Sequence, residues 1–116
     1  MKKSLKKTIL DLVRDRRGSV SFADLALNVP GFTSDDPASG FELGYPHGKN
    51  IVIWQGMSKA GADAIGDLLR DYEIILRPVG AMIYAIDGLL PAMQVAKKSR
   101  AYQRPHWLPM VIDLSA

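Results

Sequence analysis

The first third of the chain has the hydrophobic pattern of two amphipathic helices. In residues 4–17, apolar side chains recur at helical spacing on one face, while lysines and arginines occupy most other positions. Gly18 follows this run and suits the position just after a helix end. Ser21 fits the N-cap of a second, short helix, because Asp24 stands three residues later in a variant of the capping box. We therefore predict helices over residues 4–17 and 21–29.

The middle of the chain predicts a strand, a helix and a hairpin. Residues 51–54 are apolar without interruption, which favours a buried strand, and residues 58–72 have one apolar and one charged side, which favours a helix. Two further apolar runs, residues 74–79 and 82–87, are separated by Gly80 and Ala81, so a turn between two strands is predicted there. A strand, a helix and a hairpin this close together bury one sheet face against the helix, and we expect the core here.

Residues 32–49 have the composition of a loop. Aspartate, serine, glycine and proline dominate this stretch, and loops of its length usually either carry function or move. Phe41, Leu43 and Tyr45 alternate with polar or small residues. The alternation predicts a short edge strand within the loop.

The predicted order of elements over residues 4–88 resembles a winged-helix domain. The order is helix, helix, strand, helix, strand, turn, strand, with residues 79–82 as a short wing. The resemblance concerns this order and no sequence motif. It implies an α+β, winged-helix-like fold in which three helices pack on a small antiparallel sheet. Residues 1–96 would form this domain, and residues 97–116 a basic and aromatic C-terminal segment that docks on it.

Two stretches also resemble parts of small proteins from bacteria and their prophages. They are residues 50–58 and residues 104–111. No activity follows from this likeness.

Composition fits one ordinary globular domain. The chain has 116 residues, of which 47% are apolar and 23% charged. Because cysteine is absent, disulfides, thiolate metal ligands and a cysteine nucleophile are excluded. The basic start at Met1–Lys3 is not followed by an uninterrupted apolar region, and no run approaches the roughly 18 apolar residues of a membrane span. We expect a cytoplasmic protein that does not contact a membrane.

Basic residues gather at the two ends of the sequence. The formal net charge is +3, and seven of the fifteen lysines and arginines precede Gly18. Four more lie in residues 97–104, interleaved with or close to Tyr102, His106 and Trp107. Such clusters are typical of contact with phosphate backbones, and the aromatics suit base stacking. The alternatives are solvated helix ends and, from Trp107 onward, an apolar run docked on the domain or on a second copy.

These clusters and one residue near the predicted wing supply the candidate nucleic-acid-binding residues. They are Lys6, Lys7, Arg14, Arg17, Arg77, Lys97, Lys98, Arg100 and Arg104.

The helix predicted over residues 58–72 does not suit reading a DNA groove. This helix and its end carry four acids, Asp63, Asp67, Asp71 and Glu73, against the bases Lys59 and Arg70. Duplex DNA carries one negative charge per roughly 1.7 Å and repels an acidic face. Groove reading through this helix is therefore disfavoured.

Signatures of an enzyme are absent from the sequence. The two histidines lie far apart, and neither a nucleotide-binding glycine pattern nor a serine elbow is present. Asp35, Asp36 and His47 lack the spacing of a metal site. Asp63 and Asp67 are interpreted as a solvated face rather than a catalytic pair. We expect no catalysis, no cofactor and no bound metal.

Two functions follow as hypotheses. The first is a small non-enzymatic DNA-binding module, a transcription regulator carried by a phage or another mobile element. The second is a protein-interaction module on the same scaffold, which uses the acidic helix 58–72 or the apolar tail for a protein partner or a homodimer. Reversing the charges of Asp63 and Asp67 would distinguish the two hypotheses. A protein interface on this helix should fail, whereas DNA binding should be unchanged or improved.

Overall fold

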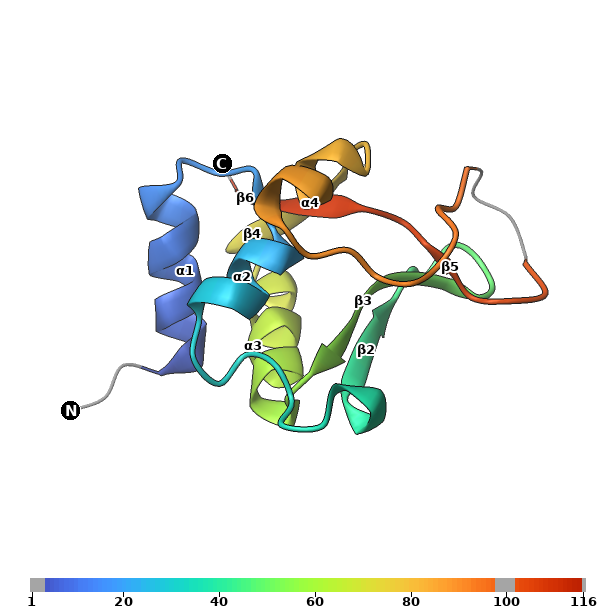
Figure 1. Cartoon of the computed structure of the whole chain (residues 1–116). Coiled ribbons are helices and arrows are strands. Elements are labelled where there is room, and N and C mark those ends of the chain that lie inside the picture. Colours follow the sequence, from blue (N-terminus) through green and yellow to red (C-terminus); the bar gives the residue numbers. More distant parts are fainter. Residues whose placement is uncertain (1–3, 98–101, 116) are drawn as a thin grey trace.

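Four α-helices and two three-stranded sheets make up the described part of the chain, residues 4–97 and 102–115 of a computed structural model (Figure 1). The fold is α+β. The helices are α1 (Leu5–Asp15), α2 (Phe22–Asn28), α3 (Lys59–Arg70) and α4 (Met82–Asp87), with a 3-10 turn η1 (Pro37–Ser39). The strands are β1 (Val20–Ser21), β2 (Phe41–Gly44), β3 (Ile51–Met57), β4 (Ile74–Pro78), β5 (His106–Trp107) and β6 (Met110–Leu114).

The first three helices confirm the predictions from sequence, with ends shifted by one or two residues. Each begins at a serine whose hydroxyl accepts a backbone N–H: Ser4 from Lys7, Ser21 from Asp24 and Ser58 from Gly61, at 2.9–3.1 Å. Gly18 follows α1 in the left-handed region at φ +88° and donates to the carbonyl of Val13. Short-range signals therefore set these helix boundaries.

The first sheet has β6 as its middle strand, between β1 and β4, and is antiparallel throughout. Val20 and Leu76 both face Ile112 across it. The prediction that residues 82–87 form a strand and pair with β4 in a hairpin is wrong, because that run forms helix α4. The connection of β4 to its real partner spans more than thirty residues.

The physical reason for this error lies in the apolar run of α4. Residues 82–87 lack the alternation of a half-buried strand, and only Tyr84 of the helix is buried. Helical hydrogen bonding starts at once, since the carbonyl of Ala81 accepts from Tyr84 and Ala85. By contrast, Met110, Val111 and Ile112 of β6 are all buried. Because consecutive side chains point to opposite faces of a strand, β6 has apolar side chains shielded from water on both faces.

The second sheet has the order β2–β3–β5. Strands β2 and β3 form an irregular antiparallel hairpin, which confirms the edge strand expected near Phe41, while β3 and β5 run parallel. Gly40 lies against the backbone of Gly56, where a Cβ would come within 2.8 Å of main-chain atoms. Gly56 itself has φ +78°. Glycine at both places allows the two backbones to approach.

Aromatic side chains pack helices α2 and α4 against strands β3 and β5 of the second sheet. Ring centroids are 6.1 Å apart for Phe22–Trp54, 5.5 Å for Trp54–Tyr84 and 4.8 Å for Tyr84–Trp107. The Tyr84 hydroxyl accepts from the N–H of Phe22 and donates to the carbonyl of Met110, and burial raises its pKa. Trp107 donates its indole N–H to the carbonyl of Ile53 at 3.2 Å. The apolar run from Trp107 onward is thus packed inside the chain.

No helix of residues 4–97 and 102–115 is long and apolar enough to cross a bilayer.

Candidate nucleic-acid interface

The predicted contact residues of α1 mostly face carboxylates. Lys6 Nζ lies 2.8 Å from Asp71 Oδ2 of the α3 C-terminus, and Lys7 and Arg14 lie 3.8 and 3.9 Å from Asp11. The bond between Lys6 and Asp71 raises the pKa of the lysine and lowers that of the aspartate. Among the described residues Arg17 makes no ion pair within 4.0 Å. The positive electrostatic potential of α1 is therefore largely offset by the carboxylates of Asp11 and Asp71.

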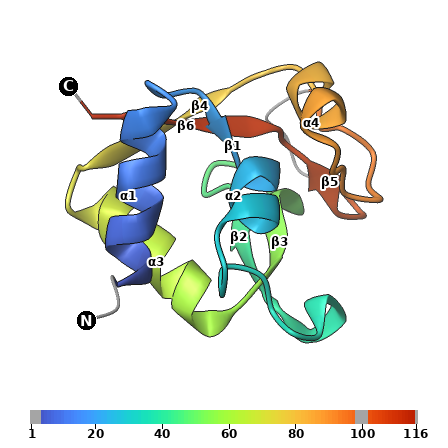
Figure 2. The ribbon, with the colours of Figure 1, turned by 60° about the vertical axis from the view of Figure 1, so that its left-hand side comes forward.

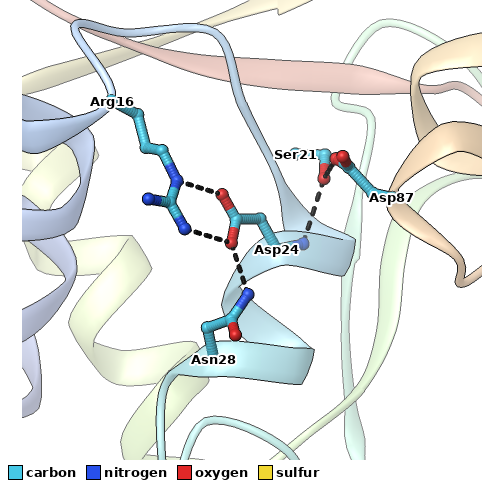
Figure 3. A network of polar contacts seen from close by, with 5 residues as sticks. All are labelled: Arg16, Ser21, Asp24, Asn28 and Asp87. Carbon is cyan, nitrogen blue, oxygen red and sulfur yellow. Dashed lines mark hydrogen bonds and ion pairs between the residues drawn. The ribbon is translucent and has the colours of Figure 1, made fainter.

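Arg16 is held in a network that closes the end of α1 onto α2 (Figure 3). Its guanidinium donates to both carboxylate oxygens of Asp24, which also accepts from Asn28. Partial burial raises the pKa of Asp24, but the hydrogen bonds from Arg16 and Asn28 outweigh it, so the net shift is downward. Ser21 in the same view is 1% exposed and donates to Asp87. Its hydroxyl also accepts the N–H of Asp24, so Ser21 both caps α2 and joins it to α4.

Arg77, expected near a wing, also has a structural partner. Its Nε donates to Asp113 Oδ2 at 2.9 Å, and Nη2 donates to the hydroxyl of Ser19 at 2.8 Å. The Arg77 bond lowers the pKa of Asp113. This side chain therefore connects β4 to β6 and to the loop before β1.

Helix α3 keeps its acidic outer face. Lys59 pairs with Asp63 at 2.9 Å and Arg70 with Asp67 at 2.7 Å, while Asp71 binds Lys6. Each base of the helix is thus matched by an acid of the same helix. No surplus of positive charge faces solvent along α3.

The opposite end of the molecule gathers cations around two stacked rings. Tyr102 and His106 stack with centroids 3.9 Å apart. The N–H of Tyr102 donates to the carbonyl of Lys49, and its hydroxyl accepts from the N–H of Lys97. His106 Nδ1 lies 2.8 Å from the carbonyl of Arg104. We call Lys49, Lys97, Tyr102, Arg104 and His106 the basic–aromatic end.

A hollow of about 430 Å³ lies at this end. Gln94, Val95, Lys97, Tyr102 and His106 line it. Within the described ranges, Lys49, Lys97 and Arg104 make no ion pair within 4.0 Å, and all three are exposed. Cations beside stacked rings can hold phosphates and bases together. Lys98 and Arg100, also predicted as contacts, lie outside the described residues.

Of the residues in the basic–aromatic end, Lys49 is a cation that the sequence did not predict as a contact. It is a single lysine in a glycine-rich loop, with no cluster around it in the sequence. The parallel pairing of β3 with β5 places it there, together with the hydrogen bond from Asn50 Nδ2 to the carbonyl of Tyr102 at 2.8 Å. No local signal indicates a pairing across more than fifty residues.

The two basic parts of the chain are far apart. Figures 1 and 2 show α1 on one side of the molecule and the segment around β5 on the other, along a body whose longest extent is 45 Å. The structure therefore does not combine the two basic clusters into one surface.

In residues 4–97 and 102–115, no group of three or more histidine, aspartate or glutamate side chains is placed to hold a metal ion. Comparisons with family models, with curated proteins and with solved structures find no match.

Proposed function

We propose that the protein is a non-enzymatic nucleic-acid-binding module that engages a single strand through its basic–aromatic end. The observation that carries the proposal is the contrast between the two basic parts. In the described part of the chain, Lys6, Lys7, Arg14 and Arg77 face carboxylates, and of the predicted contacts on this side only Arg17 does not. Lys49, Lys97 and Arg104 have no carboxylate within 4.0 Å among the described residues. A phosphate backbone is attracted most where the cations have no carboxylate to compete with it.

The stacked rings favour a single strand over a duplex. Aromatic side chains bind bases by stacking only when the bases are unpaired and splayed out, and each such stack contributes about 1–3 kcal/mol. Tyr102 and His106 line the hollow beside Lys97. A nucleotide placed there would meet a ring and a cation together.

A winged-helix core is the fold we propose behind this module. Helices α1, α2 and α3 precede the antiparallel pair β4 and β6, and β1, between α1 and α2, pairs with the far side of β6. This order differs from the predicted one, because the strand predicted before α3 is β3, which belongs to the other sheet. In this proposal the short wing is replaced by the connection that contains α4 and β5. The basic–aromatic end then belongs to an enlarged wing, while α3 takes no part in groove reading. Regulation of transcription and an origin in a mobile element stay predictions.

A protein-interaction role is the second candidate, and it has less support at the two surfaces first expected. The apolar tail is largely buried, since Trp107, Met110 and Ile112 are each at most 6% exposed. On helix α3, Asp63 and Asp67 are each bonded to a base of the same helix. We therefore place nucleic-acid binding first.

The test is fluorescence anisotropy of labelled single-stranded and duplex oligonucleotides, titrated with the protein over a range of salt concentrations. We expect the single strand to bind more tightly, with affinity that falls steeply as salt rises. Replacing Lys97 and Arg104 with glutamine should reduce the slope of log affinity against log salt by up to about 1.4, because each lost phosphate contact removes roughly 0.7 for a single strand.

The matched control replaces Lys7 and Arg14 with glutamine, which removes the same net charge from α1. This variant should keep nearly the salt slope of the wild type. An equal loss in both variants would show attraction by net charge alone, and absence of binding at low salt would refute the proposal outright.

A further inference from the structure

Strand β4 lies at an edge of its sheet, and within residues 4–97 and 102–115 no strand pairs with its outer side. The sheet order is β1–β6–β4, so β4 has β6 on one side only. The carbonyl of Glu73 accepts from Ser115, and the N–H of Val79 donates to Pro109. Because antiparallel bonding alternates, residues 73, 75, 77 and 79 bond to β6, and Ile74 and Leu76 point their N–H and C=O groups outward. Such an edge is a template for another strand.

Apolar surface surrounds this edge. Ile75 is 48% exposed and Tyr72 is 81% exposed. A hollow of about 500 Å³ runs beside the strand, lined largely by apolar residues of β2, β3 and the end of α3, among them Leu43, Ile53 and Leu69. A second strand laid along β4 would remove part of this surface from water.

The sequence of the edge is complementary to itself. In an antiparallel pairing of two copies centred on Ile75, Ile74 of one copy lies opposite Leu76 of the other, and these pairs use the outward backbone groups. Ile75 then faces Ile75 of the second copy. On the same face, Glu73 lies opposite Arg77 of the second copy, and Arg77 lies opposite its Glu73. Opposite charges directly across a pair are stabilising, whereas like charges are not.

We propose that β4 is a self-association edge, where two copies of this chain pair about a two-fold axis through Ile75 and extend the sheet from three strands to six. The charge complementarity of Glu73 and Arg77 favours a second copy over an unrelated peptide. The carboxylate of Asp113 already binds Arg77 at 2.9 Å, so the guanidinium would be shared between Asp113 and the second copy's Glu73. Pro78 lacks an N–H to offer at the edge, so the pairing is short and concentration-dependent. The inference does not depend on nucleic-acid binding.

Cross-linking through a single introduced cysteine tests the geometry. The chain has no cysteine, so Ile75→Cys contains one thiol, and the axis would bring it opposite its copy in a non-hydrogen-bonded pair with a Cα separation of about 4.5 Å, within the range of a disulfide. We expect oxidation to give a covalent dimer in high yield. Ile86→Cys on α4 is the matched control, since Ile86 is 76% exposed and lies away from the edge. Equal yields from the two variants would mean random collision and would overturn the proposal.

Sedimentation equilibrium of the uncross-linked protein tests the association itself. The wild type should shift from monomer to dimer as concentration rises. Ile75→Lys should stay monomeric, because it places two like charges at the axis, and Glu73→Arg should weaken the dimer by facing Arg77. Ile86→Lys should associate like the wild type, and circular dichroism should show all variants folded. A wild type that remains monomeric, or a dimer indifferent to Ile75→Lys, would refute the edge as a self-association site.

Discussion

Asp113 shows how one carboxylate joins three parts of this chain. It accepts the backbone N–H of Ser19 at 2.6 Å and the guanidinium of Arg77 at 2.9 Å, and so connects the loop after α1 and strand β4 to β6. Its side chain is 23% exposed. Because Arg77 and Ser19 lie 36 and 94 residues from Asp113, the sequence shows only an arginine near a predicted turn and predicts a nucleic-acid contact for it.

The pH dependence of stability should reveal this contact. Since the pKa of Asp113 is lowered in the folded chain, its contribution is present above the unfolded value of about 3.9 and is lost as pH falls through the folded pKa. Asp113→Asn should lower the free energy of unfolding at neutral pH by about 1–2 kcal/mol, and by less in acid. Urea unfolding at neutral and acid pH measures both. Asp35→Asn, at an exposed site with no side-chain bond to any described residue, should be near neutral. A loss for Asp113→Asn that is the same at every pH would contradict the prediction.

At the scale of elements, two glycines of α3 differ in their surroundings. A Cβ on Gly61 would lie 2.5 Å from the carbonyl oxygen of Phe32 and 3.1 Å from its ring. A Cβ on Gly66 would meet only the end of the flexible Arg70 side chain, at 3.7 Å. The first turn of α3 therefore packs directly on the chain that leads out of α2, and the middle of the helix does not.

Alanine substitutions should have opposite effects at these two sites. Gly66→Ala should stabilise the fold by about 0.5–1 kcal/mol, because alanine loses less backbone entropy in a helix. Gly61→Ala gains the same propensity but must displace the Phe32 backbone, so we expect a net loss of about 1–3 kcal/mol. Thermal or urea unfolding of the two variants side by side measures the difference. Two stabilising substitutions would mean that α3 does not contact Phe32 as described.

Elements with local signals could be predicted, and pairings between distant elements could not. Ser21 with Asp24, and Gly18 after a run of helical periodicity, define α1 and α2 within a few residues, and the alternation at Phe41 reveals β2. The run 82–87 has no such signal, and its assignment depended on proximity to β4. The partner of β4 is β6, since β6 buries more apolar surface, and nothing in the sequence near β4 records this choice.

The candidate site follows the same division. Tyr102, His106, Lys97 and Arg104 could be predicted because cations and aromatics are interleaved in the sequence. Lys49 could not, since only the parallel β3–β5 pairing brings its loop beside Tyr102. The ion pairs of α1 could be anticipated only in part: Lys7 with Asp11 is a helical neighbour pair, whereas Lys6 with Asp71 joins two helices.

At the scale of the whole molecule, the acids of α3 lie apart from the basic–aromatic end. Helix α3 carries Asp63 and Asp67 on its outer face. Figures 1 and 2 show α3 and the segment around β5, which holds the basic–aromatic end, in different parts of the molecule. Exposed charges separated by more than about 8 Å are largely screened at physiological ionic strength. The acids of α3 should therefore affect a nucleic acid bound at the basic–aromatic end only at low salt.

Reversing the charges of Asp63 and Asp67 to lysine tests this arrangement. At low salt we expect a modest gain in affinity for single strands, of less than about tenfold, and no gain at about 0.15 M, because the new charges act only over long range. The control replaces Asp35 and Asp36 with lysine, which changes the net charge by the same amount on the loop that carries η1. Its affinity for single strands should change with salt in the same way as that of the α3 variant. A gain that persists at high salt for the α3 variant alone would place nucleic acid on α3. Anisotropy titrations of both variants at two salt concentrations decide between these sites, because only direct phosphate contact survives screening.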